Sequence, residues 1–379
     1  MKLICNGRIH NAIEREPFEA DILIDGGKIV RIEKGIDCPE VEKIDASGLD
    51  VYPGFVEAHA HTGLSGYAIG YEGVDYNEIN DPVCPHLRAI DAIQPFDRTL
   101  REAAEAGVTC ICTGPGSANV LGGTFAVIKP VGRRVDDMCV RREAAMKCAF
   151  GENVKNVYRD KGNYSRMSTA AKLREALFKA REYARKIEMA DGDPAKLPPF
   201  DMKCSALLPV LRREIPLKAH AHQADDMFTA LRIAREFDVD ITLEHCTEGH
   251  LVADLLAREN VPVAVGPTFA TPHKYECRHV SWTTPGVLDR AGLRVSIITD
   301  APFTPQRHLT LCAALAIEAG MDPFHALQAI TINPARHIGV ADRVGSLEAG
   351  KDADIVLMDG SPFSLSTKIC AVFINGERV

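Results

Sequence analysis

The stretch PLKAHAHQADDMFTALRIAREFDVDITLEH, residues 216–245, contains a short apolar run, an amphipathic segment and a second short apolar run. Near-continuous apolar strands that alternate with helices are typical of a parallel sheet covered by helices. The same alternation extends outward, from about residue 51 to about residue 345. The further strand candidates are GVTCICTG (107–114), AVIKPVG (126–132), AAMKCAFG (144–151), VPVAVGP (261–267) and LRVSIITD (293–300). About eight such units favour a (β/α)8 TIM barrel over a doubly wound sheet, and no G-x-G-x-x-G follows a strand candidate.

The two ends of the chain have a different pattern of short strands and glycine turns. ADILIDGGKIVRIEKG (20–35) alternates on both sides of Asp25-Gly26-Gly27, which is a strong hairpin signal. ADIVLMDG (353–360) and KICAVFINGERV (368–379) resemble it, yet neither end has enough strands for a stable sheet. We therefore predict that residues 1–50 and 346–379 form one composite β-sandwich, with residues 51–345 as the barrel and residues 155–200 as an insertion.

Composition places the chain among ordinary globular proteins. Of its 379 residues 46% are hydrophobic and 25% charged, with a net charge of −8, which excludes a disordered or fibrous chain. Basic and acidic residues are interspersed, so no nucleic-acid partner is expected, and no apolar run is long enough for a membrane helix. The N-terminus turns polar too soon for a signal peptide, and the twelve scattered cysteines contain no C-x-x-C pair. These features indicate a cytoplasmic protein with free thiols, either a monomer or a homo-oligomer.

Histidines and one aspartate stand where several strand candidates end. GFVEAHAHTG (54–63) and IPLKAHAHQ (215–223) each carry two histidines two residues apart, so that both side chains of a pair share one face of a strand. The carboxyl ends of barrel strands form the functional face of this fold, and imidazole and carboxylate groups suit divalent metals. The pattern predicts one metal site at the barrel mouth. The residues concerned are His59, His61, His220, His222, His245 and Asp300.

Four segments resemble motifs of the amidohydrolase superfamily, and within it the imidazolonepropionase-like amidohydrolases. They are YPGFVEAHAHTG (52–63), LEHCTEGH (243–250), IITDAP (297–302) and residues 331–362. The resemblance implies a (β/α)8 barrel with a β-sandwich and metal-dependent hydrolysis. It carries metal roles onto His59, His61, His220, His245 and Asp300. The fifth-strand motif V-x-x-H-A matches His220-Ala221, which leaves His222 as a substrate contact.

The resemblance also raises the question of a second metal ion. Binuclear members bridge two metals with a glutamate or a carboxylated lysine, and AAMKCAFGENVK (144–155) offers both Glu152 and Lys147. We favour Glu152, which follows a glycine at the end of an apolar run, while Lys147 and Lys129 remain open. Zinc is the expected metal, as one or two ions, although iron, manganese and nickel suit the same ligands.

The expected reaction is hydrolysis of a C–N bond in a cyclic amide or lactam, an N-acyl amino acid or a dipeptide. A metal-bound hydroxide would attack, with Asp300 as general base and His245 helping to polarise the carbonyl. The alternative is a nucleobase-type deaminase, but those members place a glutamate where this chain has Gln223. A metal-free binding protein is a remote alternative, because every expected ligand position is filled.

Substrate contacts are expected from groups close to these ligands. His222 and Gln223 follow the fifth-strand histidine, and GPTFATPHKYECRH (266–279) supplies candidates for a substrate carboxylate. Those candidates are His273, Lys274 and Arg278. Tyr67 and Tyr71 are candidates for a mobile rim, and Tyr158, Arg159 and Arg166 for a lid or a contact with a second subunit. Cys246 is expected to be a packed thiol.

Overall fold

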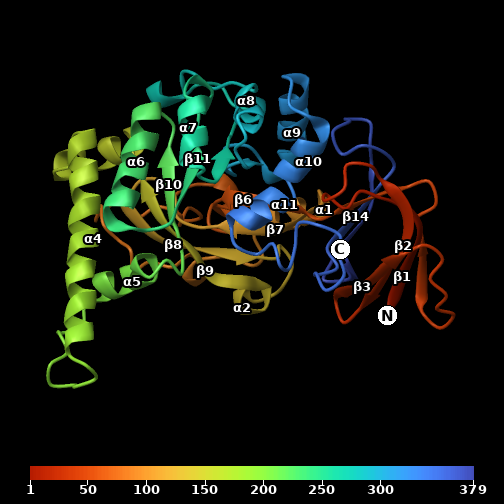
Figure 1. Cartoon of the computed structure of the whole chain (residues 1–379), viewed down its shortest axis with the longest axis horizontal. Coiled ribbons are helices and arrows are strands. Elements are labelled where there is room, and N and C mark those ends of the chain that lie inside the picture. The colour runs from red at the N-terminus through yellow and green to blue at the C-terminus, as the bar shows by residue number, and fades with distance from the viewer.

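The computed structural model describes residues 1–379 and contains two sheets, one of which is built from both ends of the chain (Figure 1). Its strand order is β16-β15-β14-β5-β1-β2-β3, and β4 pairs with β1. The N-terminal strands are β1 (Lys2–Ile9), β2 (Phe18–Asp25), β3 (Lys28–Glu33), β4 (Glu42–Asp45) and β5 (Asp50–Pro53). The C-terminal strands are β14 (Ile355–Met358), β15 (Ile369–Ile374) and β16 (Glu377–Arg378).

This end sheet agrees with the expected pairing of the two termini but differs in detail. The eight strands are hydrogen-bonded into one continuous sheet, in which β1 pairs with β2, β4 and β5. The hairpin prediction is confirmed, because Asp25 pairs with Lys28 across Gly26 and Gly27, whose φ angles are 54° and 77°. The boundary expected at residue 51 falls inside β5, which pairs with β14 and therefore belongs to the end sheet.

The second sheet has eight strands that follow one another in chain order around a barrel. They are β6 (Phe55–Ala60), β7 (Val108–Thr113), β8 (Leu121–Ile128), β9 (Cys139–Ala149), β10 (Leu217–Ala221), β11 (Ile241–His245), β12 (Val263–Val265) and β13 (Val295–Ile297). Helices outside the segment between β9 and β10 include α1 (Arg98–Glu105), α6 (Ala224–Phe237), α7 (Ala253–Glu259), α8 (Thr284–Arg290), α9 (Leu309–Glu318), α10 (Pro323–Ala329) and α11 (Ile332–His337). The fold is thus mixed α/β with a parallel-rich barrel and a second sheet.

One strand corrects the expectation of a regular (β/α)8 barrel. β8 runs antiparallel to both β7 and β9, whereas the other neighbouring strands are parallel. Residues 114–120 join β7 to β8, and this link is too short for a parallel crossover, which takes about a dozen residues or more. Only the one-turn helix α2 (Val135–Met138) separates β8 from β9. The chain therefore folds back on itself at this point.

A buried carboxylate joins β6 to the segment that follows β13, where the sheet order begins and ends. Glu57 accepts hydrogen bonds from the backbone N–H of His59 at 3.0 Å and of Thr299 at 2.9 Å. It also accepts the Thr299 hydroxyl at 2.6 Å. Burial raises the pKa of Glu57 to about 7. The Glu57 side chain thus links the first and last strands of the barrel, whereas the other neighbouring strands are linked by backbone hydrogen bonds.

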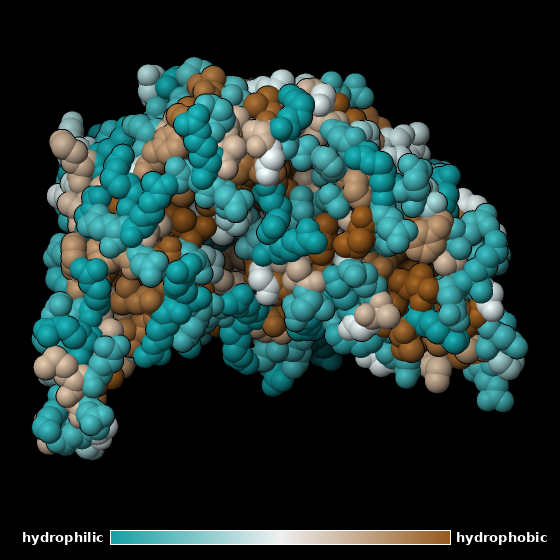
Figure 2. Space-filling model, in the orientation of Figure 1, coloured by the Kyte–Doolittle hydropathy of each residue, from teal (hydrophilic) through white to brown (hydrophobic).

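The segment between β9 and β10 contains α3 (Glu152–Tyr158), α4 (Arg166–Met189) and α5 (Met202–Leu211). The expected insertion, residues 155–200, includes part of α3 and all of α4, whereas α5 lies beyond it. Ser165 and Ser168 form a capping box at the start of α4, whose far end extends beyond the rest of the molecule (Figures 1 and 2). Figure 2 shows that the visible face is mostly hydrophilic. Tyr158 is fully buried, and its hydroxyl lies 2.8 Å from Asn119 Nδ2, so it is a core residue rather than part of a lid.

The cysteines and the helices bear on other features noted in the sequence. All twelve cysteines are free, and Cys246 is buried in the largest apolar cluster, as expected for a packed thiol. Each helix is too short or too polar to pass through a lipid bilayer.

Lys129, one of the candidates for a bridging ligand, lies away from the strand ends that carry the histidines. Because β8 is antiparallel, its last residues point to the opposite end of the barrel. There the buried Lys129 ammonium pairs with Asp354 and, at 3.2 Å, with Asp352. Burial alone would lower the pKa of Lys129, but these carboxylates raise it. Lys129 therefore joins the barrel to the end sheet and does not face a metal.

We expect Lys129→Met to lower the free energy of unfolding by about 3–5 kcal/mol, because Asp354 loses its buried counter-charge. Urea unfolding followed by circular dichroism measures the change. Lys34→Met is the control, because Lys34 pairs with Glu19 on the surface and should contribute less than about 1 kcal/mol. Equal unfolding midpoints for the two variants would contradict the structural role of Lys129.

Candidate active site

The histidines and the aspartate singled out in the sequence converge at one end of the barrel. His59 lies on β6 and His61 just beyond it, His220 lies on β10, His245 ends β11, and Asp300 follows β13. All five are buried. Ligand atoms of four of them, together with those of His222, form two clusters in which every atom lies within 4.8 Å of the others. His61 is in neither cluster. One cluster contains His220, His222 and His245, the other contains His59, His245 and Asp300, and His245 is common to both.

Local backbone geometry explains how two of these side chains reach the site. Strand alternation places Glu244 in the barrel interior beside His59, so His245 should point outward. Instead His245 has φ 73° and Cys246 has φ 46°, a left-handed turn that brings His245 inward. Asp300 has φ 51°. Left-handed backbone at non-glycine residues is strained and concentrates at functional sites.

Three of the histidines are held in one tautomer by acceptors behind them. His59 Nδ1 lies 3.0 Å from Glu244 Oε2, and His61 Nδ1 lies 2.7 Å from the Gly114 carbonyl oxygen. His245 Nδ1 lies 2.8 Å from the Gly266 carbonyl oxygen. Since a carboxylate or carbonyl only accepts, each Nδ1 carries the proton. Each Nε2 is then left with a lone pair, which is the arrangement of metal-binding histidines.

Several buried nitrogen and oxygen atoms at the centre of the site lack a hydrogen-bond partner and could be satisfied by a cation. His61 Nε2 lies 3.3 Å and His59 Nε2 3.7 Å from Asp300 Oδ1, so lone pairs face a carboxylate oxygen. Asp300 Oδ1, His245 Nε2 and His220 Nδ1 are all buried without a hydrogen-bond partner. A buried unsatisfied polar atom costs about 1–3 kcal/mol. A divalent ion would satisfy these atoms together, so the residues present fit a metal.

The ionisation states also suit metal binding. Burial lowers the pKa of His59, His220 and His222 well below the ordinary value, and that of His245 to about 4. Burial alone would raise the pKa of Asp300, but His245, His61 and His59 hold it below its usual range. At neutral pH the site thus contains neutral imidazoles and a carboxylate, the forms that bind metals.

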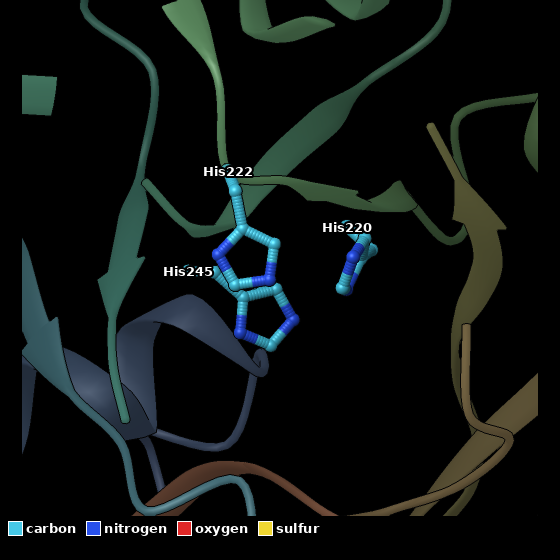
Figure 3. Close-up of side chains that lie close together, drawn as sticks. All are labelled: His220, His222 and His245. Carbon is cyan, nitrogen blue, oxygen red and sulfur yellow. The ribbon is translucent and has the colours of Figure 1, made fainter. Parts of the chain in front are cut away.

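Figure 3 shows the imidazoles of His220, His222 and His245 gathered around one space. The rings of His222 and His245 are stacked with centroids 4.7 Å apart, and the His220 ring meets that of His245 edge-on at 4.3 Å. His222, expected as a substrate contact, is therefore close enough to the other two histidines to share an ion with them.

Lys147 lies at the centre of the site, whereas Glu152 does not. Lys147 is fully buried on β9, and its Nζ is 3.2 Å from His59 Nε2. Burial lowers the pKa of Lys147 to about 8, although Asp300 and Glu244 act in the opposite direction. Of the two open bridging candidates on this segment, Lys147 is the one that contacts a metal-ligand histidine.

The preference for Glu152 as the bridge does not agree with its position. Gly151, with φ 84°, turns the chain after β9, and Glu152 becomes the first residue of α3. The Glu152 carboxylate accepts the backbone N–H of Glu276 at 3.3 Å and is in neither histidine cluster. The glycine that suggested a strand end in fact directs Glu152 away from the ligands.

A network of buried charged groups lies behind His59 and is centred on Glu244. This residue was not singled out in the sequence. Glu244 binds Lys218 Nζ at 2.9 Å, His337 Nε2 at 2.8 Å and the Thr242 hydroxyl at 2.6 Å, in addition to His59. Burial alone would raise its pKa, but Lys218 and His337 hold it well below the usual value. This carboxylate orients His59, a candidate metal ligand, and such a role is often played by a residue that is not itself a ligand.

A pocket opens onto the site. It is lined by Ser117, Asn153, His220, His222, Thr247, Pro267, Ala270, Thr271, His273, Lys274, Cys277, Val280, Asp300 and Phe303. His222, His273 and Lys274, predicted substrate contacts, are thus on its wall. Gln223 is not, since it binds Arg166 at the start of α6. Arg278 is not either, because it pairs with Glu248 at 2.7 Å.

The residues expected at a mobile rim or in a lid do not line this pocket. Tyr67 lines a neighbouring pocket together with Thr62 and Gln306, and Tyr71 is 91% exposed. Arg166 is tied to Asp226 at 2.9 Å, which fixes the start of α4 rather than leaving it free to move as a lid.

Glu276 is a second residue that the sequence did not indicate. It lies in the loop between β12 and α8 and is completely buried beside His220, His222 and Lys274. Burial alone would raise its pKa, but His222 and Lys274 lower it below the ordinary value. The loop has no periodicity, so sequence reasoning had no means of telling which of its side chains turn inward.

Comparison with known proteins identifies the family. The model of the amidohydrolase family matches residues 51–379. The crystal structure of an amidohydrolase from Thermotoga maritima MSB8 superposes with a TM-score of 0.97 at 37% identity, covering 100% of this chain and 99% of that one. This chain belongs to the amidohydrolase family, which confirms the resemblance in its motifs.

Two curated relatives extend the comparison. Amidohydrolase tasK of Hapsidospora irregularis is 29% identical over 387 residues, which cover 94% of this chain and 39% of that protein. This chain thus corresponds to about two fifths of the length of tasK. The imidazolonepropionase of Thermoplasma acidophilum is 26% identical over 373 residues, covering 90% of this chain and 83% of that protein. Family members generally bind divalent metal and act on small molecules, and the cluster described above fits such an ion.

Proposed function

We propose that this protein is a metal-dependent hydrolase that cleaves a C–N bond in a small cyclic amide or lactam, an N-acyl amino acid or a dipeptide. The observation that carries the proposal is the 3.3 Å approach of His61 Nε2 to Asp300 Oδ1, an arrangement that a shared divalent cation would stabilise. His59, His61, His220, His245 and Asp300 would hold the metal, with zinc as the first candidate. A bound divalent ion supplies an acidified water and polarises the substrate carbonyl.

The side chains around the ligands have separate tasks in this proposal. Asp300 is ionised, so it can accept a proton from water and return it to the leaving nitrogen. His222 Nδ1 lies 2.7 Å from the Thr247 hydroxyl. If that hydroxyl donates, His222 Nε2 carries a proton and can donate to the developing oxyanion, a role for which His245 was also a candidate.

Lys274 gives the pocket a polar anchor for the substrate. Its ammonium group has three N–H bonds, of which one points to Glu276 Oε1 at 2.6 Å and one to Asn153 Oδ1 at 3.2 Å. The third remains for a substrate oxygen, and a carboxylate would use it best. Phe303, Pro267 and Val280 supply apolar wall on the same pocket. This arrangement supports a substrate with one charged end and one apolar part.

We further propose that Lys147 bridges two metal ions as its carbamate. An ammonium 3.2 Å from His59 Nε2 would repel a divalent ion bound there, so the charge has to be removed. CO2 can do this: the neutral Nζ forms an N–C bond to its carbon, one C=O electron pair moves to oxygen, and one proton leaves. The product is an anion with two oxygen ligands on the same buried side chain.

This bridge predicts how metal loading depends on pH. Because the pKa of Lys147 is about 8, its neutral form predominates above that pH and is scarce below it. Under a fixed pressure of CO2, bound metal should rise from about one to about two equivalents per chain, most steeply near pH 8. Metal analysis after gel filtration measures this. In Lys147→Met, loading should stay low and independent of CO2, and CO2-dependent loading of that variant would refute the bridge.

The function itself is tested with protein stripped of metal and then reconstituted with zinc or manganese. We expect hydrolysis of at least one member of a panel of lactams, N-acyl amino acids and dipeptides, lost after chelation and restored by metal. Metal-dependent release of ammonia from aminated nucleobases alone would favour the deaminase alternative. Failure of the folded protein both to bind metal and to hydrolyse any substrate would favour the metal-free binding protein.

A further inference from the structure

The carboxylate of Glu276 contacts both the metal site and the substrate pocket, and none of the roles assigned above uses it. Its Oε1 lies 2.6 Å from Lys274 Nζ, 3.5 Å from His220 Nε2 and 3.8 Å from His222 Nε2. Its Oε2 accepts the backbone N–H of Glu152 at 2.7 Å. A carboxylate that is completely buried is costly unless such partners compensate for the loss of water.

Two features fix the position of this carboxylate. Glu276 and Glu152 each accept the backbone N–H of the other, at 2.7 Å and 3.3 Å, so the loop before α8 is tied to the start of α3. Gly151 makes room for the contact, because a Cβ at this position would lie 2.3 Å from Glu276 Oε2. Glu276 is therefore held at one place beside His220 rather than left free in a loop.

The position of Glu276 determines which nitrogen of His220 is free. A carboxylate only accepts, so the His220 nitrogen that faces it, Nε2, is the one that carries the proton. His220 Nδ1 then keeps its lone pair, and this is the atom that is buried without a partner. The other three ligand histidines are held in the opposite tautomer by acceptors at Nδ1.

We infer that Glu276 is a positioning residue that holds His220 in its metal-binding tautomer through Nε2 and, with the same oxygen, holds Lys274 in the pocket wall. The inference rests on the proposed metal site and adds to it. One carboxylate thereby connects the metal ligands with the group proposed to bind the substrate. Loss of such an orienting partner typically costs about 10–100-fold in metal affinity.

The test is a titration of metal-free protein with Co²⁺, followed by its d–d absorption and by the metal retained after gel filtration. Glu276→Gln should bind Co²⁺ about 10–100-fold more weakly than the wild type and give a weaker d–d band. The amide can present a donor to His220 Nε2, which favours the wrong tautomer. Glu276→Asp keeps the charge but withdraws it by one methylene, and it should also lose affinity.

Two control variants distinguish the positioning of His220 by Glu276 from a general loss of structure around the site. Glu248→Gln changes a buried glutamate that pairs with Arg278 and accepts the Ala224 N–H, and it should leave Co²⁺ binding unchanged. Glu152→Ala removes one of the two bonds between the loops but keeps the Glu276 carboxylate, and it should bind Co²⁺ more tightly than Glu276→Gln. Equal losses in Glu152→Ala and Glu276→Gln would overturn the inference in favour of loop anchoring.

The outcome also distinguishes this inference from the proposed function. If the wild type binds Co²⁺ and both Glu276 variants bind it equally well, the inference fails and the metal site stands. If the wild type binds no Co²⁺, the proposed metal site fails and the inference fails with it.

Discussion

Asp300→Asn is expected to reduce hydrolysis by about 10²–10⁴-fold, the usual contribution of a positioned general base. An asparagine amide is close in shape to the carboxylate and keeps one oxygen near His61, so part of the metal affinity should remain. It cannot, however, accept a proton from water. Steady-state rates on the best substrate of the panel, together with metal analysis of the same samples, measure both quantities.

The control for this variant is Asp254→Asn, which removes a carboxylate that is 73% exposed on α7. Its rate should equal that of the wild type. If Asp300→Asn loses its metal completely, Asp300 acts mainly as a ligand. If it keeps both metal and rate, the assignment of Asp300 as general base is wrong.

Glu244→Gln is expected to lower both stability and metal affinity, with a loss of about 3–5 kcal/mol in the free energy of unfolding. The substitution removes the counter-charge of Lys218, which is 1% exposed, and leaves a buried ammonium group without a carboxylate. It also weakens the hold on His59 Nδ1, so metal affinity should fall by about 10–100-fold. Urea unfolding of the metal-free protein measures the first effect without the second.

A glutamate on the surface provides the comparison. Glu175 pairs with Lys179 one turn away on α4, with both side chains more than half exposed. Glu175→Gln should therefore change the unfolding free energy by about 0.5 kcal/mol or less. A Glu244→Gln variant as stable as Glu175→Gln would show that the buried network does not support the site.

Much of the candidate site could be predicted because it depends on local regularities. Strand alternation puts His59 and His61 on one face, and the same rule applies to His220. Asp300 could be placed because it directly follows an apolar run. His245 could be placed by the same reasoning, although the left-handed turn that brings it inward is not visible in the sequence.

Tertiary structure decides the roles of the residues that were missed, Glu276 and Glu244, and of the bridging candidate that was left open, Lys147. Lys147 lies within a strand rather than at its end and faces Lys218 across β9 and β10. Two buried lysines side by side contradict the usual expectation that lysine is exposed. Glu276 belongs to an irregular loop, and Glu244 became meaningful only once its four partners were known. Sequence patterns report periodicity, but they do not report which distant groups compensate a buried charge.

The strand that turns back, β8, was misplaced for a similar reason. The apolar pattern suggested residues 126–132, whereas the strand is Leu121–Ile128. Gly122 and Gly123 weaken the apolar signal at its start. Gly123 has φ 109° and lies close to the Leu87 carbonyl oxygen. A Cβ at this position would be only 2.3 Å from that oxygen, so a larger residue does not fit. The glycines that this close backbone contact requires therefore interrupt the apolar pattern, and the start of the strand could not be recognised in the sequence.

The end sheet has a consequence for the order of events during synthesis. β5 and its partner β14 are separated by about 300 residues, so at about 5–20 residues per second the ribosome makes β14 roughly 15–60 s after β5. In that interval the edge of β5 lacks its partner, and apolar residues such as Ile22 and Val51 lack the cover of Ile355 and Phe373. Unpaired edges and uncovered apolar faces favour aggregation. Nascent chains that stall before residue 355 should therefore depend on chaperones even when their barrel has already folded.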